Sequence, residues 1–406
     1  MNLTSITIRI AFVILACLPL QSCLITDHVQ PGNKVQAQLQ QLTDSLYQHL
    51  NAKWGIDKGG IFLRVTTPTG SNLVSSNIEP GVQDDSHFRI ASITKTFTAA
   101  AIMRLHQEGK LSIYDFIPAY LPNTPAYNIP YKNQIKIRQL LQHRGGVFDL
   151  TNQNIPNTVN QPYAGKRYSD YVRGDLNQDT HTFTFDELIG VVAQNGLTNF
   201  APGSRFQYSN TGYNLLAKII EQASGMTYSD YITKTFLEPL HLTHTYSVWE
   251  GTDTRMKAPF VESFLYVPGM KAINTSEDNM SINVSEGNIV STPADISKWM
   301  ELLLTGQAGV SAANVALMKE MQVADVGHGV YGLGLTDNEG LGFGHNGAHL
   351  SYLSTLRYNP ATRTTVLIVA TFFKTGSSPE ESNADFTHLA FSLQKTALRA
   401  VQMANR

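Results

Sequence analysis

The sequence predicts a two-lobed α+β protein in which both chain ends build one antiparallel sheet flanked by helices. Apolar runs surround a turn signal, Pro68-Thr69-Gly70, near the N-terminus. A second pair of runs surrounds Asn359-Pro360 near the C-terminus. Between about residues 111 and 283 the pattern is mostly helices and long loops, which indicates an inserted, mainly helical lobe. The predicted strands are residues 60–67, 72–78, 351–358 and 364–371.

Helices are predicted where apolar residues recur at steps of three and four. Residues 35–50 show this pattern and should pack on the sheet, and residues 386–401 form a closing helix. Residues 147–178 are polar and predict a long surface loop. The remaining predicted helices are residues 137–143, 186–194, 212–223 and 228–236, and one that Thr292 caps with Pro293 at its first position.

Length and composition limit the class of protein. The chain has 406 residues, 42% of them hydrophobic, which is ample for a large core in one or two domains. Its formal net charge is −2, so nothing indicates a nucleic-acid partner.

The first 22 residues predict a signal peptide. Arg9 precedes an apolar run, residues 10–20, that is too short to span a bilayer comfortably. The run ends in Leu20-Gln21-Ser22-Cys23, which resembles a bacterial lipobox in which the cysteine carries lipid. We therefore expect export to the periplasm, a lipid anchor on Cys23 as the only membrane contact, and a tether over residues 23–34. An ordinary cleaved signal peptide is the alternative.

Cysteine usage agrees with export. The chain has two cysteines, and both lie in this leader. The folded part should then hold no internal disulfide and no cysteine-based metal site.

The chain is organised around Ser92-Ile93-Thr94-Lys95. The alanine-rich residues that follow favour a helix, and Gly109 ends it. Residues three apart on a helix are neighbours, so Lys95 should lie beside Ser92 at the helix N-terminus. A serine hydroxyl needs an adjacent base to act as a nucleophile, and a lysine in a dry site can supply one.

Two later stretches offer partners for Ser92. Tyr208 and Asn210 precede a helix, where a phenol can transfer protons and an amide can hold both Lys95 and a substrate carbonyl. His345 and Gly347 precede the predicted strand at residues 351–358, and a glycine there lets a substrate approach the backbone. The Ala348 N–H would then join the Ser92 N–H as an oxyanion donor.

Ser92-x-x-Lys95, Tyr208-x-Asn210 and His345-x-Gly347, in that order, resemble the three signature motifs of the penicillin-recognising serine hydrolases. This group contains class C β-lactamases, D-Ala-D-Ala carboxypeptidases, D-aminopeptidases and related esterases. The resemblance covers residues 35–401 and indicates one catalytic domain over residues 35–403.

The resemblance implies a role for each motif residue. Ser92 would be the acylated nucleophile, Lys95 its base partner, and Tyr208 the proton shuttle to the leaving group. Asn210 would anchor the substrate and the lysine, and His345 would sit where the family often has lysine. No metal and no organic cofactor is implied.

The sequence also departs from the family in the residues that bind a substrate carboxylate. Hydroxyl residues often flank the glycine of the third motif, but here these positions are Asn346 and Ala348. Arg144-Gly145-Gly146 stands where the family commonly has Thr-Ser-Gly. Arg357 on the following strand could bind a carboxylate from the cleft, although we expect a solvent-facing position for it.

Several other motifs are interpreted as structural. Lys374-Thr375-Gly376 ends a strand and runs into a polar turn, and Ser392 with Lys395 should lie on a helix surface. Neither His241 with His244 nor His345 with His349 has a carboxylate cluster to complete a metal site. We expect neither histidine pair to bind a metal, and neither of the other two motifs to carry chemistry.

The sequence thus predicts a serine hydrolase that forms an acyl-enzyme on Ser92. The expected substrates are cell-wall peptides, as for a D-Ala-D-Ala carboxypeptidase. A β-lactamase or an esterase of the same family is the alternative, and a non-catalytic penicillin- or peptide-sensing lipoprotein is the alternative from another class.

Overall fold

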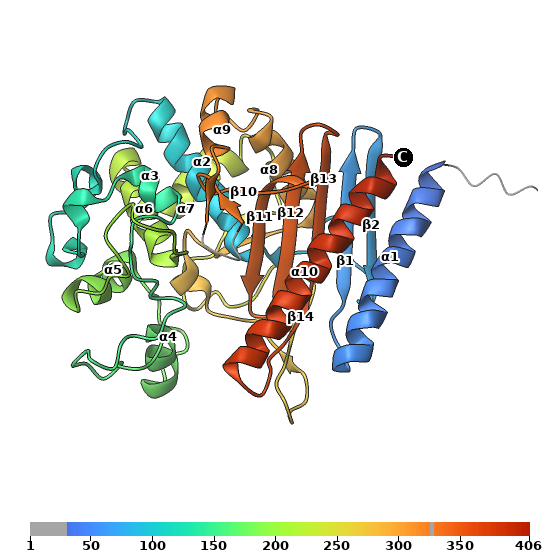
Figure 1. Cartoon of the computed structure of the whole chain (residues 1–406), viewed down its shortest axis with the longest axis horizontal. Helices are drawn as coiled ribbons and strands as arrows, with labels where there is room; N and C mark the ends of the chain where they lie inside the picture. Colours follow the sequence, from blue (N-terminus) through green and yellow to red (C-terminus); the bar gives the residue numbers. More distant parts are fainter. Residues whose placement is uncertain (1–30, 325–328) are drawn as a thin grey trace, which may run out of the picture.

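The computed structural model describes residues 31–324 and 329–406, built around an antiparallel sheet of eight strands. The N-terminal hairpin and the C-terminal strands share this sheet, which confirms the predicted fold class (Figure 1). The order across the sheet is β2 (Gly70–Ser76), β1 (Ile61–Thr67), β13 (Thr364–Ala370), β12 (Tyr352–Asn359), β11 (Gly342–His349), β10 (Thr336–Asn338), β9 (Val330–Tyr331) and β8 (Gln322–Val323).

Two three-stranded sheets flank the large one. The first joins β3 (Phe88–Arg89), β7 (Ile289–Ser291) and β4 (Tyr246–Ser247). The second joins β14 (Phe372–Lys374), β5 (Phe264–Tyr266) and β6 (Ile273–Asn274). Because β3 ends two residues before Ala91, its pairing with β7 fixes the backbone that leads into the Ser92 turn.

Side chains of the central strands alternate between two cores, as the period of two requires. Ile61, Leu63 and Val65 of β1 face a core shared with two helices, α1 (Pro31–Trp54) and α10 (Pro379–Ala404), whereas Phe62 faces the other side. Figure 1 shows both helices on the same side of the sheet. The predicted helices at residues 35–50 and 386–401 are confirmed, and α10 begins earlier because Ser378 caps it. No helix in the described ranges is both long and apolar enough to cross a membrane.

The opposite face of the sheet packs against α8 (Pro293–Leu304), with α2 (Thr94–Gln107) and α9 (Ala312–Met318) in the same core. The ring of Phe97 stacks on Trp299 with centroids 3.8 Å apart and an interplanar angle of 7°. The Trp299 indole also donates to Thr96 Oγ1 over 2.8 Å. Phe97 and Thr96 both lie on α2, and Trp299 lies on α8. These two contacts therefore hold α8 against the helix that carries Lys95.

The predicted helices of the inserted segment are present. They are α3 (Ile137–Leu141), α5 (Phe185–Gln194), α6 (Asn210–Ser224) and α7 (Tyr228–Ile232). Ser209 caps α6, and Gly225 ends it at a φ of +70°. The predicted surface loop at residues 147–178 contains the short α4 (Tyr168–Asp170) and a single π-helical turn.

Phe97 gives a direct test of how α2 is held. Its side chain is fully buried, so Phe97→Ala should lower the free energy of unfolding by about 3–5 kcal/mol through lost transfer energy and a cavity. Urea denaturation of the wild type and the variant measures this difference in the free energy of unfolding. Phe391→Ala is the matched control because that ring is 65% exposed, and its effect should stay within about 0.5 kcal/mol. Equal losses in the two variants would contradict this packing.

Candidate active site

Ser92 lies in a 3₁₀ turn, Ala91–Ile93, that continues directly into α2. Ala91 has a φ of +49°, a left-handed conformation that turns the chain sharply before the serine. Two hydrogen bonds fix this turn to β7: Ile90 N donates to Ile289 O, and Ile289 N donates to Thr94 Oγ1. The serine is therefore presented from a rigid support at the start of a helix, as the sequence predicts.

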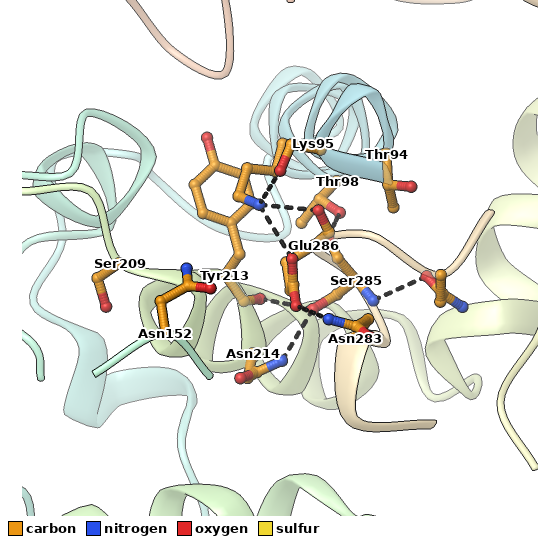
Figure 2. Close-up of polar contacts among 12 residues, drawn as sticks. Thr94, Lys95, Thr98, Asn152, Ser209, Tyr213, Asn214, Asn283, Ser285 and Glu286 are labelled. Carbon is orange, nitrogen blue, oxygen red and sulfur yellow. Dashed lines mark hydrogen bonds and ion pairs between the residues drawn. The ribbon is translucent and has the colours of Figure 1, made fainter. Parts of the chain in front are cut away.

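Lys95 is fully buried, and its Nζ lies 3.2 Å from Ser92 Oγ. Nζ also donates to the backbone oxygen of Glu286 over 2.8 Å and lies 3.2 Å from Oε2 of the same residue. Figure 2 shows Lys95 reaching from α2 toward the loop that carries Glu286. Burial lowers the pKa of Lys95 because it disfavours the charged form, and the Glu286 carboxylate acts in the opposite direction.

Tyr208 packs directly on the lysine, whose Nζ lies 4.8 Å from the centre of the tyrosine ring. The His143 ring also packs on Tyr208, with the two ring centroids 4.1 Å apart. Burial raises the pKa of Tyr208 well above its usual value, while the neighbouring Ser92 hydroxyl acts in the opposite direction. The phenol therefore stays protonated in the resting site and can donate a proton.

Asn210 is the first residue of α6 and is almost fully buried beside the cleft. Its side-chain oxygen has no hydrogen-bond partner among the described residues. The donors of Lys95 go to Ser92 and Glu286 instead. The Asn210 oxygen thus has unused hydrogen-bonding capacity among the described residues, and the role of Asn210 toward substrate stays a prediction.

His345 and Gly347 lie within β11, a strand that the sequence patterns did not predict. His345 Nδ1 is 2.6 Å from Asn346 O, and Nε2 is 2.8 Å from the Tyr331 hydroxyl. A carbonyl oxygen can only accept, so Nδ1 carries the proton and Nε2 accepts from Tyr331. Burial lowers the pKa of His345 to about 3, with the nearby Lys95 charge acting in the same direction. His345 is therefore neutral at ordinary pH.

Gly347 occupies a position without room for a side chain. A Cβ there would lie 2.4 Å from Ile90 O and 2.5 Å from Ser354 Oγ. The residue before the Ser92 turn thus packs directly on β11, which brings the third motif against the first. Ala348, the next residue, is exposed and lines the cleft.

These residues surround one cleft of about 1220 Å³. Ser92, Tyr208, Asn210, His345, Gly347 and Ala348 line it, and Lys95 lies beneath Ser92. The three motifs, which are far apart in the sequence, therefore meet at one opening as predicted. Within residues 31–324 and 329–406, no group of three or more His, Cys, Asp or Glu side chains could hold a metal ion.

The expected solvent-facing position of Arg357 is wrong, because this residue is fully buried on β12 opposite Gly344. Its guanidinium donates to Asn346 Oδ1 over 2.9 Å and to Asn338 Oδ1. Burial lowers its pKa to about 9. Thr355 also donates to Asn346 Oδ1, so the oxygen of that amide is engaged and the NH₂ group is left for the cleft.

The two alternative motifs lie outside the cleft. Lys374-Thr375-Gly376 ends β14, where Lys374 pairs with Asp385 over 3.1 Å, and leads into α10. Ser392 and Lys395 lie on α10, and Lys395 is exposed. The predicted positions of both motifs, at a strand end and on a helix surface, are confirmed. Cys23 and the predicted signal peptide lie outside the described residues.

Sequence reasoning missed Glu286. A single acidic residue carries no recognisable spacing, and only the fold reveals its contact with Lys95. The hydrogen bond between Tyr331 and His345 was missed for the same reason.

The fold and this site together define a serine hydrolase. A model of the Beta-lactamase family matches residues 65–389, and the chain therefore belongs to that family.

Two curated relatives match part of the chain. Protein flp of Staphylococcus aureus (strain NCTC 8325 / PS 47) is 30% identical over 214 residues, which are 51% of this chain and 38% of Flp. Penicillin-binding protein 4* of Bacillus subtilis (strain 168) is 32% identical over 166 residues, which are 40% of this chain and 31% of that protein. The matched part thus spans less than half the length of these relatives.

Solved structures share the fold at low identity. A D-stereospecific amidohydrolase from Streptomyces sp. is 23% identical with a TM-score of 0.70, over 83% of this chain and 94% of the other. The D-amino acid amidase from Ochrobactrum anthropi SV3, complexed with L-phenylalanine amide, is 21% identical with a TM-score of 0.70, over 91% and 100% of the chains. A penicillin binding protein from Bacillus halodurans is 19% identical with a TM-score of 0.63, over 84% and 98%.

The protonation state of His345 is directly measurable. The imidazole nitrogen shifts of His345 should remain those of the neutral Nδ1–H form from pH 8 down to pH 5, with assignment by loss of the signal in His345→Gln. In the unfolded chain this side chain gains its proton near a pKa of about 6.5. Its contribution to stability is therefore present above that pH and is lost as pH falls toward 3. A titration near 6.5 in the folded protein would contradict this assignment.

Proposed function

We propose that the protein hydrolyses D-configured peptide or amide bonds of cell-wall type, through an acyl-enzyme on Ser92. The observation that carries this proposal is the 3.2 Å contact between Ser92 Oγ, which lines the cleft, and the buried Lys95 Nζ. The order of motifs supports it, as do neighbours named as D-stereospecific amidohydrolase and D-amino acid amidase.

The chemistry follows from the site. Lys95 in its neutral form accepts the Ser92 proton as Oγ attacks the substrate carbonyl carbon. The N–H groups of Ser92 and Ala348 stabilise the oxyanion. Tyr208 then donates its proton to the leaving amine and is reprotonated from Lys95, and water releases the acyl group by the reverse proton path. Asn210 and Asn346 hold the substrate by hydrogen bonds.

Ser92→Ala should lower the rate of D-alanine release from a short peptide ending in D-Ala-D-Ala by about 10⁴-fold or more, because the acyl-enzyme cannot form. The same peptide ending in L-Ala-L-Ala is the substrate control and should be a poor substrate for the wild type. Equal rates for wild type and Ser92→Ala would reject the proposed nucleophile.

Intact mass after brief exposure to benzylpenicillin separates the related activities. A Ser92-dependent adduct that persists supports a D-peptidase. Consumption of the drug without an adduct indicates a β-lactamase instead, and turnover of simple esters alone indicates an esterase. A persistent adduct in a protein that turns over no peptide, amide or ester would indicate a penicillin-sensing lipoprotein.

We also propose, from the sequence of the leader, that Cys23 carries a lipid that anchors the exported protein. The wild type expressed in a bacterium should incorporate an alkyne-labelled fatty acid and partition into a detergent phase. Cys23→Ala should lose the label, since the lipid is attached to this thiol. A labelled Cys23→Ala protein would contradict the anchor.

A further inference from the structure

The mechanism above makes no use of Glu286, a carboxylate buried at the bottom of the same cleft. Its side chain is 2% exposed, and Oε2 lies 3.2 Å from Lys95 Nζ. The other carboxylate oxygen accepts a hydrogen bond from Asn283 Nδ2 over 2.7 Å, so the group is oriented rather than loose (Figure 2). A buried charge of this kind is costly unless it is paired, and its partner here is the base of the reaction.

The hydrogen bonds of Lys95 show why this pair matters. An ammonium has three N–H donors and no acceptor. Lys95 Nζ has three oxygen neighbours within hydrogen-bond distance: Ser92 Oγ, Glu286 O and Glu286 Oε2. As an ammonium, Lys95 therefore donates to Ser92 and cannot take its proton. It becomes a base only after losing one proton, and Glu286 Oε2 is the ionisable group in contact with it.

We propose that Glu286 sets the pH below which Ser92 loses its base, by stabilising Lys95 as an ammonium. The inference rests on the proposed acyl-enzyme function. Above that pH, Nζ loses one proton to solvent and becomes a neutral amine beside the carboxylate. The amine then accepts the Ser92 proton. Glu286 acts through Lys95, so it is a positioning residue for that proton.

The other groups that face Lys95 do not replace Glu286 in this role. The rings of Tyr208 and Tyr213 lie 4.8 and 5.5 Å from Nζ, and burial keeps both phenols protonated. His345 on β11 is neutral. Asp149 acts on Lys95 through space without a direct contact, and burial raises its own pKa to about 6.

The test measures nucleophile activation without a substrate-specific step. A fluorophosphonate probe reacts as Ser92 Oγ bonds to phosphorus, fluoride leaves, and the serine proton passes to Lys95. The labelling rate is measured from pH 4.5 to 9 for wild type and Glu286→Gln, whose amide keeps the shape but not the charge. Loss of the carboxylate favours neutral Lys95, so the acidic limb of the profile should move about 1–3 pH units lower.

Two matched variants separate contact from general electrostatics. Asp149→Asn removes a buried charge that does not touch Lys95, so it should move the acidic limb less than Glu286→Gln does. Asn283→Leu removes the donor that stabilises the Glu286 carboxylate but keeps the glutamate. It should move the limb in the same direction as Glu286→Gln, and it serves as the second test if Glu286→Gln fails to fold.

The outcomes distinguish this inference from the proposed function. Equal labelling of wild type and Ser92→Ala would reject the nucleophile itself. With Ser92-dependent labelling, profiles of Glu286→Gln and Asn283→Leu that overlay the wild type would overturn the role of Glu286. So would a shift in Asp149→Asn as large as that in Glu286→Gln, or a folded Glu286→Gln protein that is unreactive at every pH.

Discussion

The site depends on keeping one lysine dry beside one serine. A lysine in water is protonated and useless as a base, whereas burial lowers its pKa by disfavouring the charge. The structure achieves this burial with the rings of Tyr208 and Tyr213 and with the backbone and side chain of Glu286. Burial alone would leave the ammonium unpaired and costly, so the nearby carboxylate balances the two protonation states.

That constraint explains why the sheet and the helices are joined as they are. The Phe97–Trp299 stack holds α2 on α8, and the pairing of β3 with β7 fixes the turn before Ser92. β11 then approaches this turn so closely that position 347 has no space for a Cβ. Three segments far apart in the chain are thereby brought to the same cleft.

The predictable part of this architecture is the part with a local signal. The α1 pattern and the Thr292 cap of α8 each depend on a few neighbouring residues, and each forms as predicted. β11 was missed because Gly342, Gly344 and Gly347 weaken any strand pattern. The fold explains these glycines: a Cβ at position 344 would lie 2.0 Å from Leu356 O. The low strand propensity of these glycines is overridden by close packing against residues that lie far away in the sequence.

The three motifs were predictable because their residue types and order are themselves a signal, but the charges around them were not. Arg357 and Glu286 are single charged residues without a diagnostic spacing, and both are buried against partners from other elements.

Their positions change the charge that the cleft presents to a substrate. His345 is neutral where the family often has a lysine, and the Lys95 charge is balanced by Glu286. Arg357 is fully buried at the cleft wall, and its guanidinium donates to the amide oxygens of Asn338 and Asn346. Arg167 and Arg173 also line the cleft, and they pair with Asp170 and Asp278 respectively. These cations are thus already engaged by carboxylates or amide oxygens, so a substrate carboxylate would have to compete with those partners for them.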